Sequence, residues 1–197
     1  MTIESAKAMN FVPMDHPLGR RISIVGNGGK TTLSLALSRK TSLPFIEMDA
    51  IFWKPNWVES TAEEMIAGMN AAIDAAPDGW IIDGHYWSKV DDLVLSQADM
   101  VIWLDLPWGV MFWRMLVRSF RRAWDKNKIC GDNTEGWRQM FSKNALWWYW
   151  ITNRSTFKRR QERLSTLLPD TTPVVRLTSA SELDSFYKLH DLTRTSS

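Results

Sequence analysis

The sequence has little of the chemistry that marks secreted, metal-binding or membrane-spanning proteins. Among its 197 residues it holds one cysteine, Cys130, so it can form no internal disulfide and has no paired-cysteine metal motif. Such sparing use of cysteine is typical of a reducing cytoplasm, which is the location that we expect. No apolar run approaches the roughly 18 residues that span a bilayer. The N-terminus also lacks the basic start and apolar stretch of a secretory signal.

The net charge is small, and histidine is scarce. The formal net charge is only +2, so no overall basic field indicates a nucleic-acid partner. The three histidines form no Ser/His/Asp or metal-ligand spacing, which leaves His85 at most as a substrate-contact residue. Tryptophan is abundant instead, with 12 residues, several of them within residues 145–151. Tryptophan favours membrane surfaces, which is one interpretation of this cluster. We favour helix packing instead, because a mostly apolar set recurs at spacings of three and four and would form one helical face: Trp137, Met140, Phe141, Asn144, Trp148 and Ile151.

Short apolar runs alternate with segments of helical periodicity five times along the chain. This alternation predicts an α/β fold, with a five-stranded parallel sheet and helices on both faces. The predicted strands cover residues 20–26, 43–49, 80–84, 99–107 and 173–179; the predicted helices cover residues 31–40, 62–76, 89–97, 108–124, 137–168 and 181–189, with a polar loop at 125–136. We expect residues 1–19 to be a loosely held lead-in and residues 20–197 to form one domain, in which residues 108–168 carry a mobile helical lid.

The stretch IVGNGGKTTLS joins the first predicted strand to the first predicted helix, which is the context of a phosphate-binding loop. Glycines let backbone N–H groups turn toward an anion, and the start of the helix adds its dipole. We expect Lys30 to reach the β- and γ-phosphates of a nucleotide and Thr31 to hold Mg²⁺. The alternative is a glycine-rich turn with an exposed lysine. The candidate nucleotide-binding residues are Gly26, Asn27, Gly28, Gly29, Lys30, Thr31 and Thr32.

Two carboxylates and two arginines fall where they could serve this loop. Asp49 and Asp83 end the second and third predicted strands, and ligands of parallel sheets bind outside the carboxyl ends of the strands. Both carboxylates are candidates to order Mg²⁺ and its waters, although helix or turn caps would use the same residues. Arg114 and Arg118 lie four residues apart on one helical face. Above the loop they would clamp phosphate oxygens; a solvated basic face or a nucleic-acid patch is the alternative.

Together these segments resemble adenylate-kinase-related P-loop kinases, and most closely the group labelled DNA topology modulation proteins. The resemblance covers about residues 20–190 and is carried by RISIVGNGGKTTLSLAL, FIEMDAIFWKPNWVE, WIIDGHY, ADMVIWLDLP and GDNTEGWRQMFSKN. The pair formed by MDAIFWKPNW and WIIDGHY is more specific for this group than the loop alone. The resemblance implies a P-loop NTPase fold and an ATP-dependent phosphotransferase core that uses ATP and Mg²⁺.

The resemblance also implies roles for individual residues. Lys30 and Thr31 match the lysine and the hydroxyl of the loop, and Asp83 matches the Mg²⁺-associated acid of the DG pair that closes the third strand. Arg114 matches the arginine that lies against adenine, and Arg118 matches an arginine that contacts phosphates near the lid. We therefore expect Lys30, Asp83 and Arg118 to be catalytic.

The acceptor side shows both matches to the group and departures from it. Asp49 falls where related small-molecule kinases hold acceptor or metal, and Gly84 would lie near the acceptor. The loop, GNGGKTT, is two residues shorter than the usual GNGGSGKST of the group. Trp87 follows DGHY where the group tends to carry arginine, and Thr134 replaces the arginine of GNRE. The shorter loop offers fewer N–H donors to a phosphate, and the two replacements remove cations that a nucleoside monophosphate acceptor would use.

Two functions from different classes follow from these features. The first is an ATP-dependent kinase that transfers the γ-phosphoryl group to a small acceptor, nucleotides included. The second is a nucleotide-binding regulatory or DNA-associated module with weak or no kinase activity, in which the basic helices meet nucleic-acid phosphates. Hydrolysis of a nucleoside triphosphate without a specific acceptor is a third alternative. The expected partners are a nucleotide and an unidentified small molecule, with no membrane.

Overall fold

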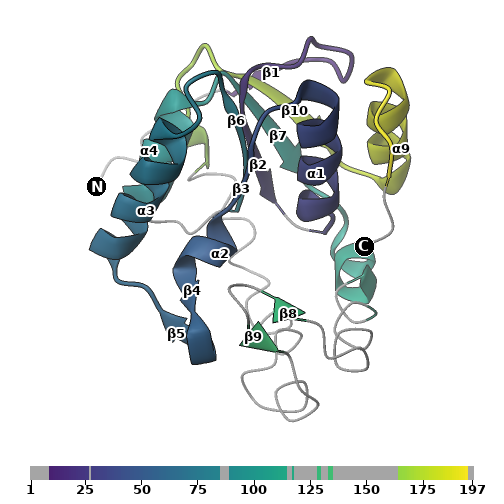
Figure 1. Cartoon of the computed structure of the whole chain (residues 1–197). Coiled ribbons are helices and arrows are strands. Elements are labelled where there is room, and N and C mark those ends of the chain that lie inside the picture. The colour runs from purple at the N-terminus through teal and green to yellow at the C-terminus, as the bar shows by residue number, and fades with distance from the viewer. Residues whose placement is uncertain are drawn as a thin grey trace, which may run out of the picture.

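The computed structural model describes residues 9–26, 28–84, 89–114, 117, 128–129, 133–134 and 164–194. Within them, six strands form one sheet in the order β1-β10-β7-β2-β6-β3, and every pairing in it is parallel. Helices flank both faces of this sheet, so the chain has an α/β fold (Figure 1). The strands are β1 (Asn10–Phe11), β2 (Arg21–Gly26), β3 (Phe45–Glu47), β6 (Trp80–Asp83), β7 (Met100–Leu104) and β10 (Pro173–Leu177). The helices are α1 (Lys30–Thr41) and α9 (Ala180–Leu189) on one face, and α3 (Ala62–Asp74) and α4 (Lys89–Gln97) on the other.

Strand β7 shows why the central strands are apolar throughout. Its side chains alternate between the two faces, because successive residues of a strand point to opposite sides. Val101 and Trp103 join the core under α3 and α4, whereas Met100, Ile102 and Leu104 join the core under α1 and α9. All five are buried. A strand covered on both faces needs no polar alternation, and this favours the parallel arrangement that the sequence predicts.

The sheet has one strand more than the five that we predict. The additional strand, β1, comes from the expected lead-in and pairs with β10 at the edge of the sheet, where Val12 N donates to Val174 O at 3.1 Å. The Phe11 ring stacks near Trp103 with centroids 6.4 Å apart, and the Arg176 guanidinium lies 4.7 Å from the Trp103 ring. A strand of only two residues is too short to show a periodic sequence pattern, so only these tertiary contacts identify β1.

Other boundaries also differ from the sequence prediction. The strand predicted at residues 43–49 ends at Glu47, and the chain turns directly into α2 (Met48–Phe52). Two short strands, β8 (Lys128–Ile129) and β9 (Asn133–Thr134), pair antiparallel inside the predicted loop 125–136. Of the predicted lid, residues 108–114 and 164–167 are helical, and most of the remainder lies outside the described residues. No helix in the described ranges is long and apolar enough to cross a bilayer.

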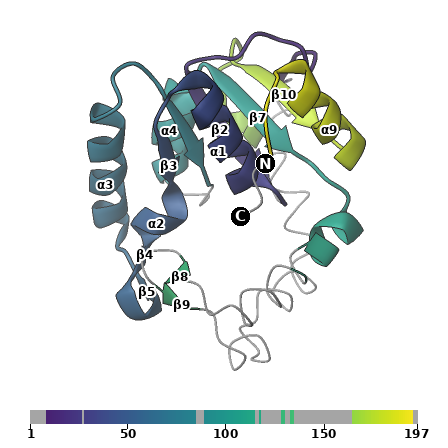
Figure 2. The same ribbon diagram turned by 45° about the vertical axis from the view of Figure 1, so that its right-hand side comes forward.

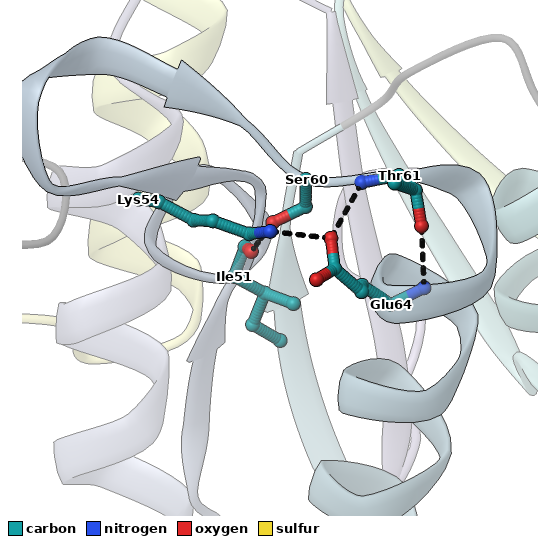
Figure 3. Close-up of polar contacts among 5 residues, drawn as sticks. All are labelled: Ile51, Lys54, Ser60, Thr61 and Glu64. Carbon is teal, nitrogen blue, oxygen red and sulfur yellow. Dashed lines mark hydrogen bonds and ion pairs between the residues drawn. The ribbon is translucent and has the colours of Figure 1, made fainter.

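An arm projects from the sheet between α2 and α3. It consists of β4 (Trp53–Lys54), η1 (Pro55–Trp57) and β5 (Val58–Glu59), and β4 pairs antiparallel with β5. Glu64 of α3 fixes its base, because its Oε2 accepts from Lys54 Nζ at 2.5 Å and from Thr61 N at 2.8 Å (Figure 3). Lys54 thereby holds the pKa of the Glu64 carboxyl below its usual value. At its tip, η1 contacts β9, and Figure 2 shows the two segments close together.

We expect Thr61→Ala to destabilise the base of this arm. Thr61 caps α3 through its side chain, which accepts from Glu64 N at 3.2 Å, while the Glu64 carboxylate accepts from Thr61 N. Loss of such an N-cap costs about 1 kcal/mol of unfolding free energy. Urea denaturation of the wild type and of Thr61→Ala measures the loss, and Thr61→Ser, which keeps the hydroxyl, should retain most of the stability. Equal stability of all three proteins would contradict the assignment of this cap.

Candidate functional site

The loop between β2 and α1 turns sharply at its glycines. Gly26, Gly28 and Gly29 have positive φ angles of 98°, 80° and 116°. A Cβ on Gly26 would lie 2.1 Å from the Leu104 carbonyl oxygen of β7, so no larger residue fits there without a shift of the backbone. Gly29 is the N-cap residue of α1, and no side chain caps this helix by a hydrogen bond. The first N–H groups of α1 therefore receive no side-chain cap, and uncapped N–H groups at a helix start favour a nearby anion.

Lys30, Thr31 and Asp83 meet at this end of the helix. Lys30 and Thr31 begin α1, and Asp83 ends β6, which pairs with β2 so that Asp83 stands opposite Ile24. Thr31 Oγ1 donates to Asp83 Oδ2 at 2.6 Å, and Lys30 Nζ lies 3.6 Å from Asp83 Oδ1. The parallel register brings together two segments that are 52 residues apart in the sequence. The structure thus places these three predicted site residues side by side.

Asp83 is buried, with only 4% of the residue exposed. Burial raises the pKa of Asp83 above its ordinary value, and the nearby Asp49 charge acts in the same direction. The Lys30 ammonium and the Thr31 hydroxyl oppose this rise, since both stabilise the ionised form. A further cation beside Asp83 would lower its pKa in the same way, and the site therefore favours positive charge.

The acceptor-side residues lie next to this group. Asp49 is exposed in the first turn of α2, two residues beyond Glu47, which stands opposite Asp83 in the sheet. Gly84 follows Asp83 with a φ of 136°, and a Cβ on it would lie 2.6 Å from the Met48 Cβ. The start of α2 and the end of β6 are therefore packed closely together. His85 lies outside the described residues.

Arg114 reaches the loop from the helix formed by residues 108–114, which follows β7. Its Nη1 donates to the Gly28 carbonyl at 3.2 Å. This contact is with the loop backbone, whereas we predict phosphate or adenine contacts for Arg114. Of the other predicted loop residues, Thr32 lies half-buried in the first turn of α1. Asn27 and Arg118 lie outside the described residues.

Sequence reasoning missed the apolar side of the loop. A Cβ on Gly28 would lie 3.5 Å from Met111 and 3.7 Å from Leu106, and a Cβ on Gly29 would lie 4.0 Å from Leu183. These side chains belong to three separate segments, and apolar residues of this kind carry no motif. The position of Leu106, two residues after the end of β7 at the same sheet edge as the loop, is the signal that could have identified it.

The donor set of the site suits a phosphate and a hard cation. The end of α1 and Lys30 offer N–H groups and positive charge, while Thr31 and Asp83 offer oxygens, the ligands that Mg²⁺ prefers. No group of three or more His, Cys, Asp or Glu side chains that could hold a metal occurs within the described ranges. A Mg²⁺ ion at Thr31 and Asp83 would therefore take further oxygens from a bound phosphate and from water.

Comparison with known proteins adds no assignment to this geometry. No protein-family model matches the chain, and no curated protein matches it.

Proposed function

We propose that the chain is an ATP-binding P-loop kinase-like protein of adenylate-kinase architecture, which transfers the γ-phosphoryl group of ATP to a small acceptor. The observation that carries this proposal is the contact of Thr31 with the buried Asp83, beside Lys30, at the uncapped start of α1. In a phosphate loop the hydroxyl and an acid from a neighbouring strand hold Mg²⁺, and the lysine cradles the β- and γ-phosphates. The described residues supply each of these groups.

Each group of the site would have a separate role in phosphoryl transfer. The first N–H groups of α1 bind the phosphates, and Lys30 orients the terminal phosphates and draws their negative charge toward itself. Thr31 and Asp83 would hold Mg²⁺, which when bound neutralises charge on the β- and γ-oxygens. Asp49, beside Asp83 and exposed, is placed to contact the acceptor. Catalysis by such a site consists mainly of positioning and charge neutralisation.

The second candidate is a nucleotide-binding regulatory or DNA-associated module. The observation that favours it is the short loop, since only residues 27–29 separate the end of β2 from the start of α1. A shorter arc presents fewer N–H groups to a phosphate chain than a full phosphate loop does. Such a protein would bind ATP without efficient transfer, and any binding to nucleic acid would fall steeply with salt.

Calorimetric titration of ATP with Mg²⁺ into the wild-type protein tests the proposal. Micromolar binding supports a nucleotide site, and ATP consumption that requires an added acceptor then supports the kinase. Binding with no consumption under any acceptor, together with salt-dependent DNA binding, would support the regulatory module. No ATP binding at all would refute both candidates.

A further inference from the structure

A contact from outside α1 fixes one peptide of the loop. Arg114 Nη1 donates to the Gly28 carbonyl, and a Cβ built on Gly29 would lie 3.7 Å from the same nitrogen. The neighbouring side chain Met111, one turn earlier on the same helix, packs under Gly28. The helix of residues 108–114, which lies below the start of α1 in Figure 1, therefore braces the peptide that links Gly28 to Gly29.

A contact from outside the loop can fix this peptide, because its two glycines impose little backbone conformational preference of their own. Gly28 and Gly29 both have positive φ angles. Glycine adopts positive and negative φ about equally readily, so neither residue by itself fixes the orientation of the peptide between them. None of the described peptide bonds is cis, and in a planar trans peptide the C=O and N–H bonds point in opposite directions. A bond from Arg114 to the Gly28 oxygen therefore directs the Gly29 N–H group away from Arg114.

We propose that Arg114 is a positioning residue for phosphate binding, which acts by fixing the orientation of the Gly28–Gly29 peptide. In a loop this short, each N–H group carries a larger share of the phosphate contacts. Holding one of them in place before the nucleotide arrives removes an entropy cost from binding. This inference rests on the proposed nucleotide-binding function. It assigns Arg114 to the backbone of the loop instead of to the adenine base.

The first test needs no nucleotide. Protein labelled with ¹⁵N-glycine reports the Gly28 and Gly29 amides in wild type, Arg114→Met and Arg20→Met. Arg20 is a matched control, because its Nε also donates to a backbone carbonyl, Asp78 O at 2.6 Å, and it precedes β2 at the end opposite the loop. We expect the Gly28 and Gly29 resonances to shift or broaden in Arg114→Met only. Unchanged loop resonances in Arg114→Met would overturn the proposal.

The second test separates the backbone from the base. Inorganic tripolyphosphate has no base, so a role of Arg114 against adenine predicts weaker ATP binding and unchanged tripolyphosphate binding in Arg114→Met. A positioning role predicts that both ligands, each with Mg²⁺, lose affinity by the same factor of about ten. Arg114→Lys, which keeps a donor of similar reach, should restore part of both affinities. A loss confined to ATP would overturn the proposal.

The two tests also distinguish this inference from the proposed function. If the wild type binds neither ATP nor tripolyphosphate, the nucleotide-binding function fails, and the phosphate role of Arg114 fails with it. The amide spectra still decide in that case whether Arg114 fixes the peptide. If the wild type binds both ligands and Arg114→Met binds them equally well with unchanged spectra, only the role of Arg114 is overturned.

Discussion

Replacement of Lys30 by methionine is expected to weaken ATP binding by roughly 100-fold and to remove phosphoryl transfer. Lys30 is the cation at the start of α1, and its Nζ lies 3.6 Å from Asp83 Oδ1. A hydrogen bond to a charged group contributes about 1.5–3 kcal/mol, and each 1.4 kcal/mol corresponds to a tenfold change in affinity. The methionine side chain keeps the apolar stem but offers no charge to the β- and γ-phosphates. Calorimetric titration of ATP with Mg²⁺ measures the effect.

The matched control for Lys30→Met is Lys40→Met. Lys40 lies at the other end of the same helix and forms an ion pair with Asp191 at 2.9 Å. Both substitutions remove one lysine, so they change the net charge equally. We expect Lys40→Met to bind ATP as the wild type does. If Lys30→Met binds ATP with wild-type affinity, the loop is not a phosphate site. If Lys40→Met weakens binding as much as Lys30→Met, the effect belongs to net charge and not to the loop.

The central part of the fold could be predicted from the sequence because its signals are local. The segment WIIDG is apolar over its first three residues and ends in a glycine, and β6 indeed covers Trp80–Asp83. Helix α4 has the predicted limits, Lys89–Gln97. Strand β1 and the early end of β3 could not be predicted, since each depends on contacts with segments distant in the sequence. For β1 these contacts come from Val174, Trp103 and Arg176.

Some contacts of the candidate site could likewise be predicted from the sequence, and others could not. That Lys30, Thr31 and Asp83 meet could be predicted, because parallel strands place their carboxyl ends at one edge and the loop follows one of those strands. The contact of Arg114 with the Gly28 carbonyl could not be predicted, because sequence spacing gives the helical face of an arginine but not the direction of a distant peptide plane. The packing of Leu106 and Met111 under Gly28 was missed because it follows from shape alone.

A second large effect is expected for Asp83→Asn, which should lower phosphoryl transfer by about 100- to 1,000-fold. A metal ion contributes several kcal/mol of charge stabilisation in a transition state, and each 1.4 kcal/mol is a factor of ten in rate. Asparagine can still accept from Thr31 Oγ1, but it brings no negative charge to hold Mg²⁺. The residual transfer should also require a higher Mg²⁺ concentration, because Thr31 and the phosphate oxygens remain as ligands. Wild-type transfer rates with wild-type Mg²⁺ dependence would exclude Asp83 from the metal site.

The same variant is expected to change how stability depends on pH. Because burial raises the pKa of Asp83 in the folded state, the folded protein binds a proton there more tightly than the unfolded chain does. Asp83 therefore makes unfolding easier as the pH rises from the unfolded pKa near 3.8 through the raised folded pKa. In Asp83→Asn this contribution is absent, so the variant should be at least as stable as the wild type at neutral pH. The advantage should shrink as the pH falls toward the unfolded pKa.

Urea denaturation across that pH range tests whether Asp83→Asn raises or lowers the free energy of unfolding. Asp191→Asn is a control for which the opposite effect is expected. The Lys40 ammonium lowers the pKa of Asp191, so its contribution is present above the unfolded pKa and is lost as the pH falls through the lowered folded value. Asp191→Asn should thus be less stable than the wild type at neutral pH, by a small amount because the pair is exposed. If Asp83→Asn is instead less stable than the wild type at neutral pH, its contacts with Lys30 and Thr31 outweigh the cost of burying the charge. Asp83 would then act as a structural anchor of the loop even without a bound cation.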